Sequence, residues 1–164
     1  HDSDLVSVLD GGLKKWINEN KKTTQSDKLF LKSSYSAKEN PALVLNKDQI
    51  NLNINHKTFE LIDARSKDRF QGLQPEPRIE LRSGSIKGSK NIPFSEVINN
   101  KDNTFKTKEE LKLIFKRLDL DLSNNLAFTC GSGVTACVLG LANSIISGNH
   151  PVVYDGSWAE YGIK

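Results

Sequence analysis

The stretch LAFTCGSGVTACVLGLANSII, residues 126–146, decides the fold class of this chain. Its first four residues, Leu126–Thr129, predict a buried strand, and the apolar run 135–146 predicts a helix. A short glycine-rich turn that begins with Cys130 joins the two. A strand that passes through such a turn directly into a helix is typical of α/β proteins.

The rest of the chain repeats this alternation. Apolar stretches predict strands at 43–45, 59–63, 91–94 and 152–154, and helical spacing predicts helices at 47–53, 66–71 and 107–117. Residues 72–88 are rich in Gly, Pro and Arg and predict a long loop. Strands that alternate with helices predict an α/β fold with a mostly parallel sheet.

Two segments resemble each other. VSVLDGGLKKW (6–16) and PVVYDGSWAEY (151–161) both predict an apolar strand, an Asp-Gly turn and a helix, when Asp10 is aligned with Asp155. This similarity favours two copies of one unit, and two unrelated turns that are alike by chance are the alternative. Residues 20–41, which follow the first segment, are rich in Lys, Thr, Ser and Asn, end at Pro41 and predict a linker.

The composition argues against several classes of protein. The net charge is +3, and the basic residues form no block of the kind that binds nucleic acid. No apolar run reaches the roughly 18–20 residues that span a membrane. The three histidines (His1, His56, His150) and two cysteines show no metal-ligand spacing, so we expect no metal.

The two cysteines are expected to differ in role. Cys130 and Cys137 lie on a strand end and the following helix, with Cα atoms roughly 10 Å apart, too far for a disulfide. Reduced thiols favour a cytoplasmic location. Cys137 lies within an apolar helical run and is expected to pack in the core.

Cys130 has the surroundings of a reactive thiol. It follows a strand, and the Gly-rich loop and helix start after it place backbone N–H groups and a positive helix end nearby. Such surroundings lower the pKa of a cysteine, and a buried structural cysteine is the alternative. The loop lacks the Arg of a C-x5-R phosphatase, since Ala136 stands there, and no C-x-x-C is present.

At this point a family resemblance extends the interpretation. CGSGVTAC resembles the active-site loop of 3-mercaptopyruvate sulfurtransferases, the two-lobed branch of the rhodanese superfamily. LIDARSKDRFQGLQPEPRIELRSGSIKGSKNIPF (61–94) is similar to the substrate-side segment of that family, and VVYDGSWAEYG to its last strand and helix. The resemblance implies a rhodanese-like domain whose mostly parallel central sheet has helices on both faces. It also implies the domain organisation: residues 1–20 as the tail of an N-terminal rhodanese-like domain, 21–41 as a linker, and 42–164 as a catalytic domain with its last residues missing.

The resemblance assigns roles to residues as well. Cys130 would take sulfur from 3-mercaptopyruvate as a persulfide, release pyruvate, and pass the sulfur to a thiol, a thioredoxin-like protein or cyanide. Arg69 and Arg78 would bind the substrate carboxylate. Ser132 would relay a proton or donate a hydrogen bond, or else simply form the turn. The remaining expected site residues are the substrate-binding loop residues Gly131, Gly133, Val134 and Thr135, and the supporting ion pair Asp63 and Arg65.

The neutral residues Gly131 and Ser132 favour mercaptopyruvate over thiosulfate, because thiosulfate-using rhodaneses place basic residues directly after the cysteine. A thiosulfate:cyanide sulfurtransferase and a non-catalytic rhodanese-like binding module remain the alternatives. We expect no cofactor. The expected partners are a small sulfur donor, a thiol or thioredoxin-like acceptor and the missing N-terminal domain, with neither nucleic acid nor membrane.

Overall fold

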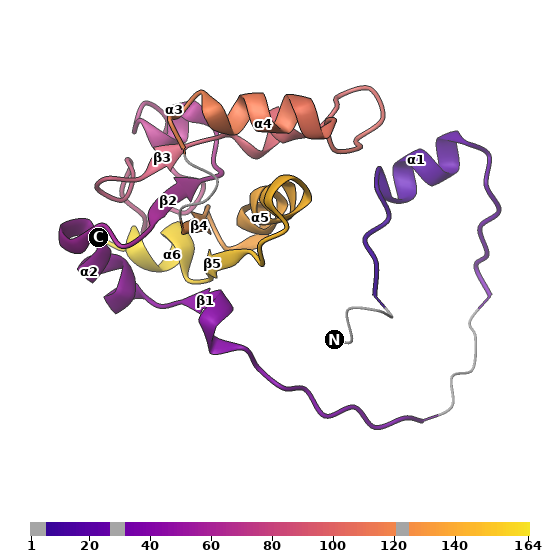
Figure 1. The fold of residues 1–164 in the computed structure, drawn as a ribbon, viewed down its shortest axis with the longest axis horizontal. Helices are drawn as coiled ribbons and strands as arrows, with labels where there is room; N and C mark the ends of the chain where they lie inside the picture. The colour runs from indigo at the N-terminus through magenta and orange to yellow at the C-terminus, as the bar shows by residue number, and fades with distance from the viewer. Residues whose placement is uncertain (1–5, 27–31, 121–124) are drawn as a thin grey trace.

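One parallel sheet organises the chain. The computed structural model describes residues 6–26, 32–120 and 125–164, so parts of the expected first-lobe tail (1–5) and linker (27–31) lie outside the described residues. The sheet has five strands in the order β1-β5-β4-β2-β3, and every neighbouring pair is parallel (Figure 1). The strands are β1 (Val44–Leu45), β2 (Glu60–Asp63), β3 (Lys90–Asn91), β4 (Leu126–Thr129) and β5 (Val152–Tyr154).

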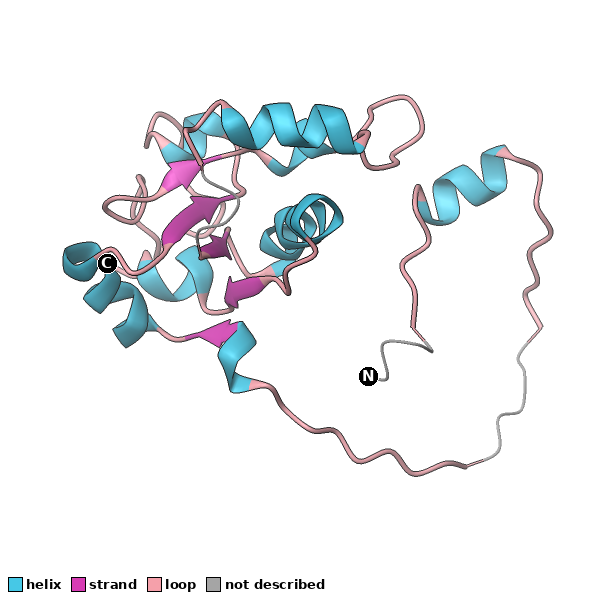
Figure 2. Ribbon diagram, viewed as in Figure 1, coloured by secondary structure: helices cyan, strands magenta, loops and turns pink. Residues whose placement is uncertain are grey.

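Helices connect these strands, as the sequence predicts (Figure 2). The connecting helices are α2 (Lys47–His56), α3 (Lys67–Phe70), α4 (Lys108–Lys116) and α5 (Val134–Ser147). Helix α1 (Gly12–Asn18) precedes β1, α6 (Ser157–Tyr161) follows β5, and 3-10 turns lie at Pro41–Leu43 and Phe94–Val97. Within the described ranges, none of these helices has the length and apolar character that crossing a bilayer requires.

Alternate residues of the central strands point to opposite faces of the sheet. Ile62 and Phe128 pack on the face that α4 and α5 cover, in one apolar cluster. Leu61 and Ala127 pack on the other face, in a second cluster that includes residues of α2 and α6. Helices therefore cover both faces (Figure 1), and the expected fold class is confirmed.

The helix after the cysteine loop is held closely against the sheet. Gly133 at its N-terminus has φ 84°, and Gly148 at its C-terminus has φ 75°, both in the left-handed region that glycine adopts at little cost. A Cβ on Gly140 would lie 2.6 Å from the Cβ of Pro151. The absence of a side chain at Gly140 thus allows α5 to approach the residue that leads into β5.

Three predicted strands differ from the structure, one in its existence and two in their bounds. Residues 6–9 form no strand, because the described residues place no neighbouring strand beside them for backbone hydrogen bonds, and Val6, Val8 and Leu9 are exposed. The first strand begins only at Val44, after a 3-10 turn that Pro41 starts. The strand expected over 91–94 ends at Asn91, before Pro93, which has no N–H to donate.

Cys137 does not pack in the core as predicted, because it is exposed. The residues of α5 that are buried, Ala136, Leu139, Gly140, Ala142 and Asn143, occupy one face of the helix. With 3.6 residues per turn, Cys137 falls on the same outward face as Val134. Both cysteines are free thiols.

The close approach at Gly140 gives a stability prediction. Glycine to alanine normally stabilises a helix interior by about 1 kcal/mol. We expect Gly140→Ala instead to lower the free energy of unfolding by about 1–3 kcal/mol, because the added methyl overlaps Pro151. Urea unfolding measures this change. Cys137→Ala, on the exposed face of the same helix, is the control and should stay within about 0.5 kcal/mol; a stabilised Gly140→Ala would contradict the packing described.

Candidate active site

The loop after β4 is held by the first turn of α6. The N–H groups of Trp158 and Ala159 donate to the carbonyl oxygens of Cys130 and Gly131, each at 2.9 Å. The N–H of Cys130 donates to the Ser157 hydroxyl at 3.1 Å, and that hydroxyl donates to the carbonyl of Tyr154. Ser157 has φ 50°, so the turn places this buried hydroxyl behind the cysteine. In a trans peptide the N–H points away from the preceding C=O, so the N–H of the residue after Gly131 is directed away from α6.

Backbone N–H groups of the cysteine loop and of the start of α5 surround the sulfur of Cys130. Burial raises the pKa of this thiol, but hydrogen bonds from the Thr135 hydroxyl and from the backbone N–H groups of Ser132, Ala136 and Thr135 outweigh it, and the pKa is lowered overall. The positive end of α5, which begins at Val134, acts in the same direction. A lowered pKa increases the thiolate fraction, and the thiolate is the nucleophilic form of cysteine.

A cavity of about 280 Å³ opens in front of this sulfur. It combines the cysteine loop, the start of α5 and the long loop after α3. Its lining residues are Arg69, Glu76, Pro77, Arg78, Leu81, Cys130, Gly131, Ser132, Val134 and Thr135. Gly133 is not among them, since it forms the turn at the start of α5, where a Cβ would lie 3.0 Å from the Asp155 carboxylate.

The two expected carboxylate-binding arginines differ in their surroundings. The Arg69 side chain is 25% exposed and forms an ion pair with Glu76, 2.5 Å from Nη2 to Oε2. Its Nη2 also lies 3.1 Å from the position that a Cβ on Gly131 would take. The Arg78 side chain is exposed and lines the cavity, and within the described residues no hydrogen bond or ion pair engages its guanidinium.

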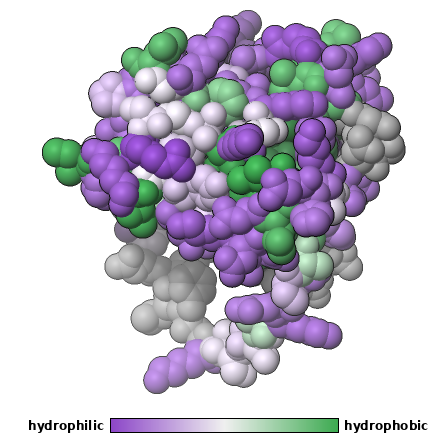
Figure 3. Space-filling view, turned by 90° about the vertical axis from the view of Figure 1, so that its left-hand side faces the viewer, coloured by the Kyte–Doolittle hydropathy of each residue, from purple (hydrophilic) through white to green (hydrophobic). Residues whose placement is uncertain are grey.

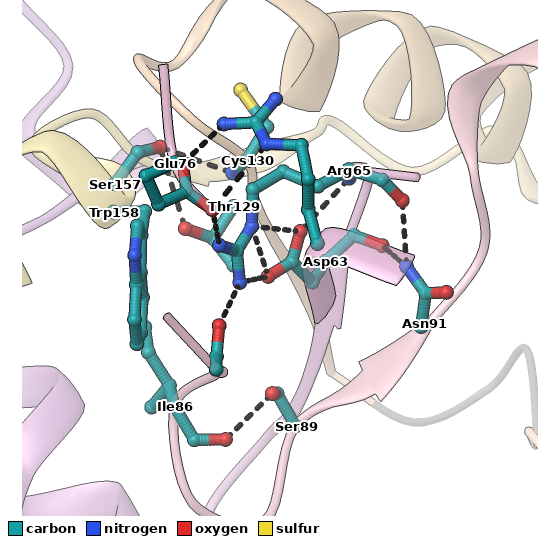
Figure 4. A network of polar contacts seen from close by, with 12 residues as sticks. Asp63, Arg65, Glu76, Ile86, Ser89, Asn91, Thr129, Cys130, Ser157 and Trp158 are labelled. Carbon is teal, nitrogen blue, oxygen red and sulfur yellow. Dashed lines mark hydrogen bonds and ion pairs between the residues drawn. The ribbon is translucent and has the colours of Figure 1, made fainter. Parts of the chain in front are cut away.

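Behind the cavity runs a buried chain of alternating charges (Figure 4). Arg65 donates to Asp63 through Nε and Nη2, with the shortest contact 2.7 Å, and through Nη1 to Glu76 at 2.8 Å. The side chains of all three residues are at most 1% exposed. The guanidinium of Arg65 also lies 4.4 Å from the ring centre of Trp158, a cation–π contact. Asp63 and Arg65 thus lie behind the cavity and do not line it.

The sequence did not single out three groups that the structure brings to this site. They are the Glu76 carboxylate, the Ser157 hydroxyl and the Thr135 hydroxyl. For Thr135 the sequence had indicated only a place in the substrate-binding loop. The only sequence signal for Glu76 was its place in the PEPR segment. A carboxylate between two prolines on a loop gives no sign that it will be fully buried.

Comparisons with known proteins agree with this geometry. Residues 46–164 match the rhodanese-like domain family. The chain belongs to the rhodanese family. It is 41% identical to mouse 3-mercaptopyruvate sulfurtransferase over 159 residues, which is 97% of this chain and 53% of that protein. It is 40% identical to mouse thiosulfate sulfurtransferase over 157 residues, 95% of this chain and 52% of that protein.

A solved structure extends the comparison to three dimensions. SseA from Escherichia coli, described as a 3-mercaptopyruvate sulfotransferase, is 30% identical, with a TM-score of 0.79 over 93% of this chain and 56% of that one. This rhodanese-family chain thus spans about half the length of the curated relatives it matches.

The hydrogen bond from Thr135 gives a prediction for the thiol. Removing the hydroxyl in Thr135→Val should raise the pKa of Cys130, so its alkylation by iodoacetamide should need a higher pH. Thr135→Ser keeps the hydroxyl and is the matched control. The rates are followed by mass spectrometry of the Cys130 peptide, because Cys137 is exposed and also reacts. An unchanged pH profile in Thr135→Val would contradict the assigned hydrogen bond.

The buried ion pair gives a second prediction. Asp63→Asn leaves the buried Arg65 guanidinium partly uncompensated, and breaking such a pair costs about 3–5 kcal/mol of unfolding free energy. Glu96→Gln, which removes the exposed ion pair with Arg117, should change it by less than about 1 kcal/mol. Denaturant unfolding of both variants tests the contrast, and equal losses would argue against a structural role of the buried pair.

Proposed function

We propose that this chain carries the catalytic site of a sulfurtransferase that moves sulfur from 3-mercaptopyruvate to a thiol or to cyanide. The observation that carries the proposal is the Cys130 sulfur, whose pKa is lowered, facing a cavity lined by two guanidinium groups. The names of the mouse relative and of the Escherichia coli structure support this activity.

The first half-reaction begins with the Cys130 thiolate. It attacks the sulfur of mercaptopyruvate, an S–S bond forms, and the C–S bond of the substrate breaks. The electron pair of that bond leaves with the carbon as the enolate of pyruvate, which then takes up a proton. The persulfide left on Cys130 gives up the proton that the substrate thiol carried, which balances the proton taken up by the enolate, and the N–H groups around the sulfur stabilise the resulting anion.

Arg78 and Arg69 hold the substrate carboxylate in this proposal. Arg78 lies at the cavity with no partner within the described part of the chain and binds the carboxylate first, while Arg69, held by Glu76, keeps it beside the cysteine loop. Ser132 lies at the cavity with an exposed side chain, in a position to pass a proton to the leaving enolate. The loop residues Gly131, Val134 and Thr135 enclose the substrate sulfur.

In the second half-reaction an acceptor takes the outer sulfur. A thiolate or cyanide attacks it, the S–S bond breaks, and the Cys130 thiolate is restored. We propose a small thiol or a thioredoxin-like protein as acceptor. For this protein we propose a cytoplasmic location; one relative, from Arabidopsis thaliana, is named as mitochondrial.

The domain organisation also belongs to the proposal. The relatives align with 97% of the chain, whereas the rhodanese-like match begins only at residue 46. We propose that 1–20 end a first rhodanese-like domain, 21–41 form the linker and 42–164 form the catalytic domain. Exposed apolar side chains support a covering protein surface at the cavity: Val134 (71% exposed) lines the cavity, and Ile79 (89% exposed) directly follows the lining residue Arg78. Figure 3 shows one face of the molecule, on which apolar groups lie among hydrophilic ones.

Thiosulfate use is the second candidate, because the identities to the two mouse sulfurtransferases, 41% and 40%, differ too little to choose between the donors. The neutral residues Gly131 and Ser132 favour mercaptopyruvate. A non-catalytic binding module would have no need of the lowered pKa of Cys130.

The mass of the intact protein tests the activity. After incubation with 3-mercaptopyruvate we expect a gain of one sulfur, about 32 Da, that is absent in Cys130→Ser and retained in Cys137→Ser. A gain with thiosulfate alone would support the second candidate. No gain with either donor, in this chain and in one joined to a first rhodanese-like domain, would reject sulfur transfer.

A further inference from the structure

The charged side chains that line the cavity carry a small net positive charge. Apart from the Cys130 thiol, its ionisable lining side chains are Arg69, Glu76 and Arg78, whose charges sum to +1. The Asp155 carboxylate lies 3.0 Å from the position that a Cβ on Gly133 would take, but Asp155 does not line the cavity. Two arginines alone would make the cavity doubly positive, so the carboxylate of Glu76 removes half of that charge.

Glu76 also determines which edge of Arg69 is available. Nε and Nη2 of Arg69 lie 3.3 and 2.5 Å from the two Glu76 oxygens, so one forked edge of the guanidinium is already used. The other edge, Nη1 and Nη2, lies 3.8 and 3.1 Å from the Cβ position of Gly131, directly beside the cysteine loop. A ligand carboxylate can therefore meet Arg69 only along this second edge.

The Glu76 carboxylate is itself fixed. Its side chain is 0% exposed, and Arg65 holds it from the opposite direction through Nη1 at 2.8 Å. Arg65 is in turn bonded to Asp63 and to the carbonyl oxygen of Gly84. The negative charge of Glu76 consequently cannot swing away when an anion enters the cavity.

We propose that Glu76 sets the charge selectivity of the cavity: by neutralising Arg69 it lowers the fixed charge from +2 to +1, which weakens the binding of doubly charged sulfur donors more than that of singly charged ones. This inference rests on the proposed function, since it concerns the donor used at Cys130. Glu76 acts through Arg69 and is a positioning residue. Mercaptopyruvate with a neutral thiol is a monoanion, and thiosulfate is a dianion.

The expected size of the effect follows from Coulomb's law. Removing the charge of Glu76 strengthens the binding of a monoanion by one unit-charge interaction and that of a dianion by two. At roughly 10 Å and an effective dielectric constant of about 20, this difference is about tenfold in affinity. Screening by salt reduces it, so the measurement belongs at low ionic strength.

Binding of two inert probes tests the inference without any sulfur transfer. Pyruvate is the monoanion and sulfate the dianion, and isothermal titration calorimetry of the full 164-residue chain carrying Cys130→Ser gives both dissociation constants. Glu76→Gln should lower the ratio of the sulfate to the pyruvate constant about tenfold. Glu76→Asp keeps the charge, so its ratio should stay within about twofold even if both constants rise.

A second pair of variants protects the test against misfolding of Glu76→Gln. Arg69→Gln brings the cavity charge to zero and should raise the ratio, whereas Arg69→Gln/Glu76→Gln returns it to +1 and should restore the ratio of the parent. If the double variant keeps the ratio of Arg69→Gln, Glu76 is merely structural and the inference is overturned. The same conclusion follows if Glu76→Gln folds, as judged by thermal unfolding, with an unchanged ratio.

The outcome is separable from that of the proposed function. Selectivity that follows the charge series, without any mass gain on Cys130 of the parent chain, would reject the sulfurtransferase and leave the anion selectivity standing. A mass gain on Cys130 with no effect of Glu76 on the ratio of the two dissociation constants would support the sulfurtransferase and reject the charge selectivity. Where both hold, Glu76→Gln should also raise kcat/KM for thiosulfate relative to mercaptopyruvate about tenfold.

Discussion

The site depends on two hydrogen bonds between α6 and the loop that carries Cys130. A helix leaves its first N–H groups without partners inside the helix, and in α6 those of Trp158 and Ala159 bond to the carbonyls of Cys130 and Gly131. Leaving such buried groups unpaired would cost about 1–3 kcal/mol each. The same bonds turn the loop carbonyls toward α6, so that N–H groups of the loop are left to surround the sulfur.

The charged groups behind the cavity serve position more than stability. Asp63, Arg65, Glu76 and Arg69 alternate in sign, and the first three are buried, so their mutual attraction is offset by the loss of hydration. The order in which these four side chains contact one another shows how Arg69 is positioned. Asp63 ends β2, an interior strand of the sheet, and each following ion pair extends from that fixed position to the guanidinium of Arg69 beside Gly131. A loop that is long and otherwise irregular thereby presents a charge at a defined place.

The sequence predicted elements well where local pattern and burial agree. Leu126–Thr129 and Val152–Tyr154 lie where the apolar runs placed them, and α4 begins at the capping residue Thr107 with its apolar side buried. It failed where the outcome depended on a neighbour. The apolar stretch 6–9 has the composition of a strand but no partner strand among the described residues. Cys137 stands in an apolar run, yet the phase of the helix turns it outward.

By itself the sequence determined the parallel α/β unit and the placement of a thiol at the end of a buried strand. Periodicity and glycine positions are local properties, and they suffice for these features. The family resemblance added candidate arginines. Only the tertiary structure decided that Arg69 is paired while Arg78 has no partner among the described residues, that Ser157 lies behind Cys130, and that Glu76 is buried between two arginines. Those features join residues from separate segments of the chain, and burial and pairing arise only when folding brings such segments together.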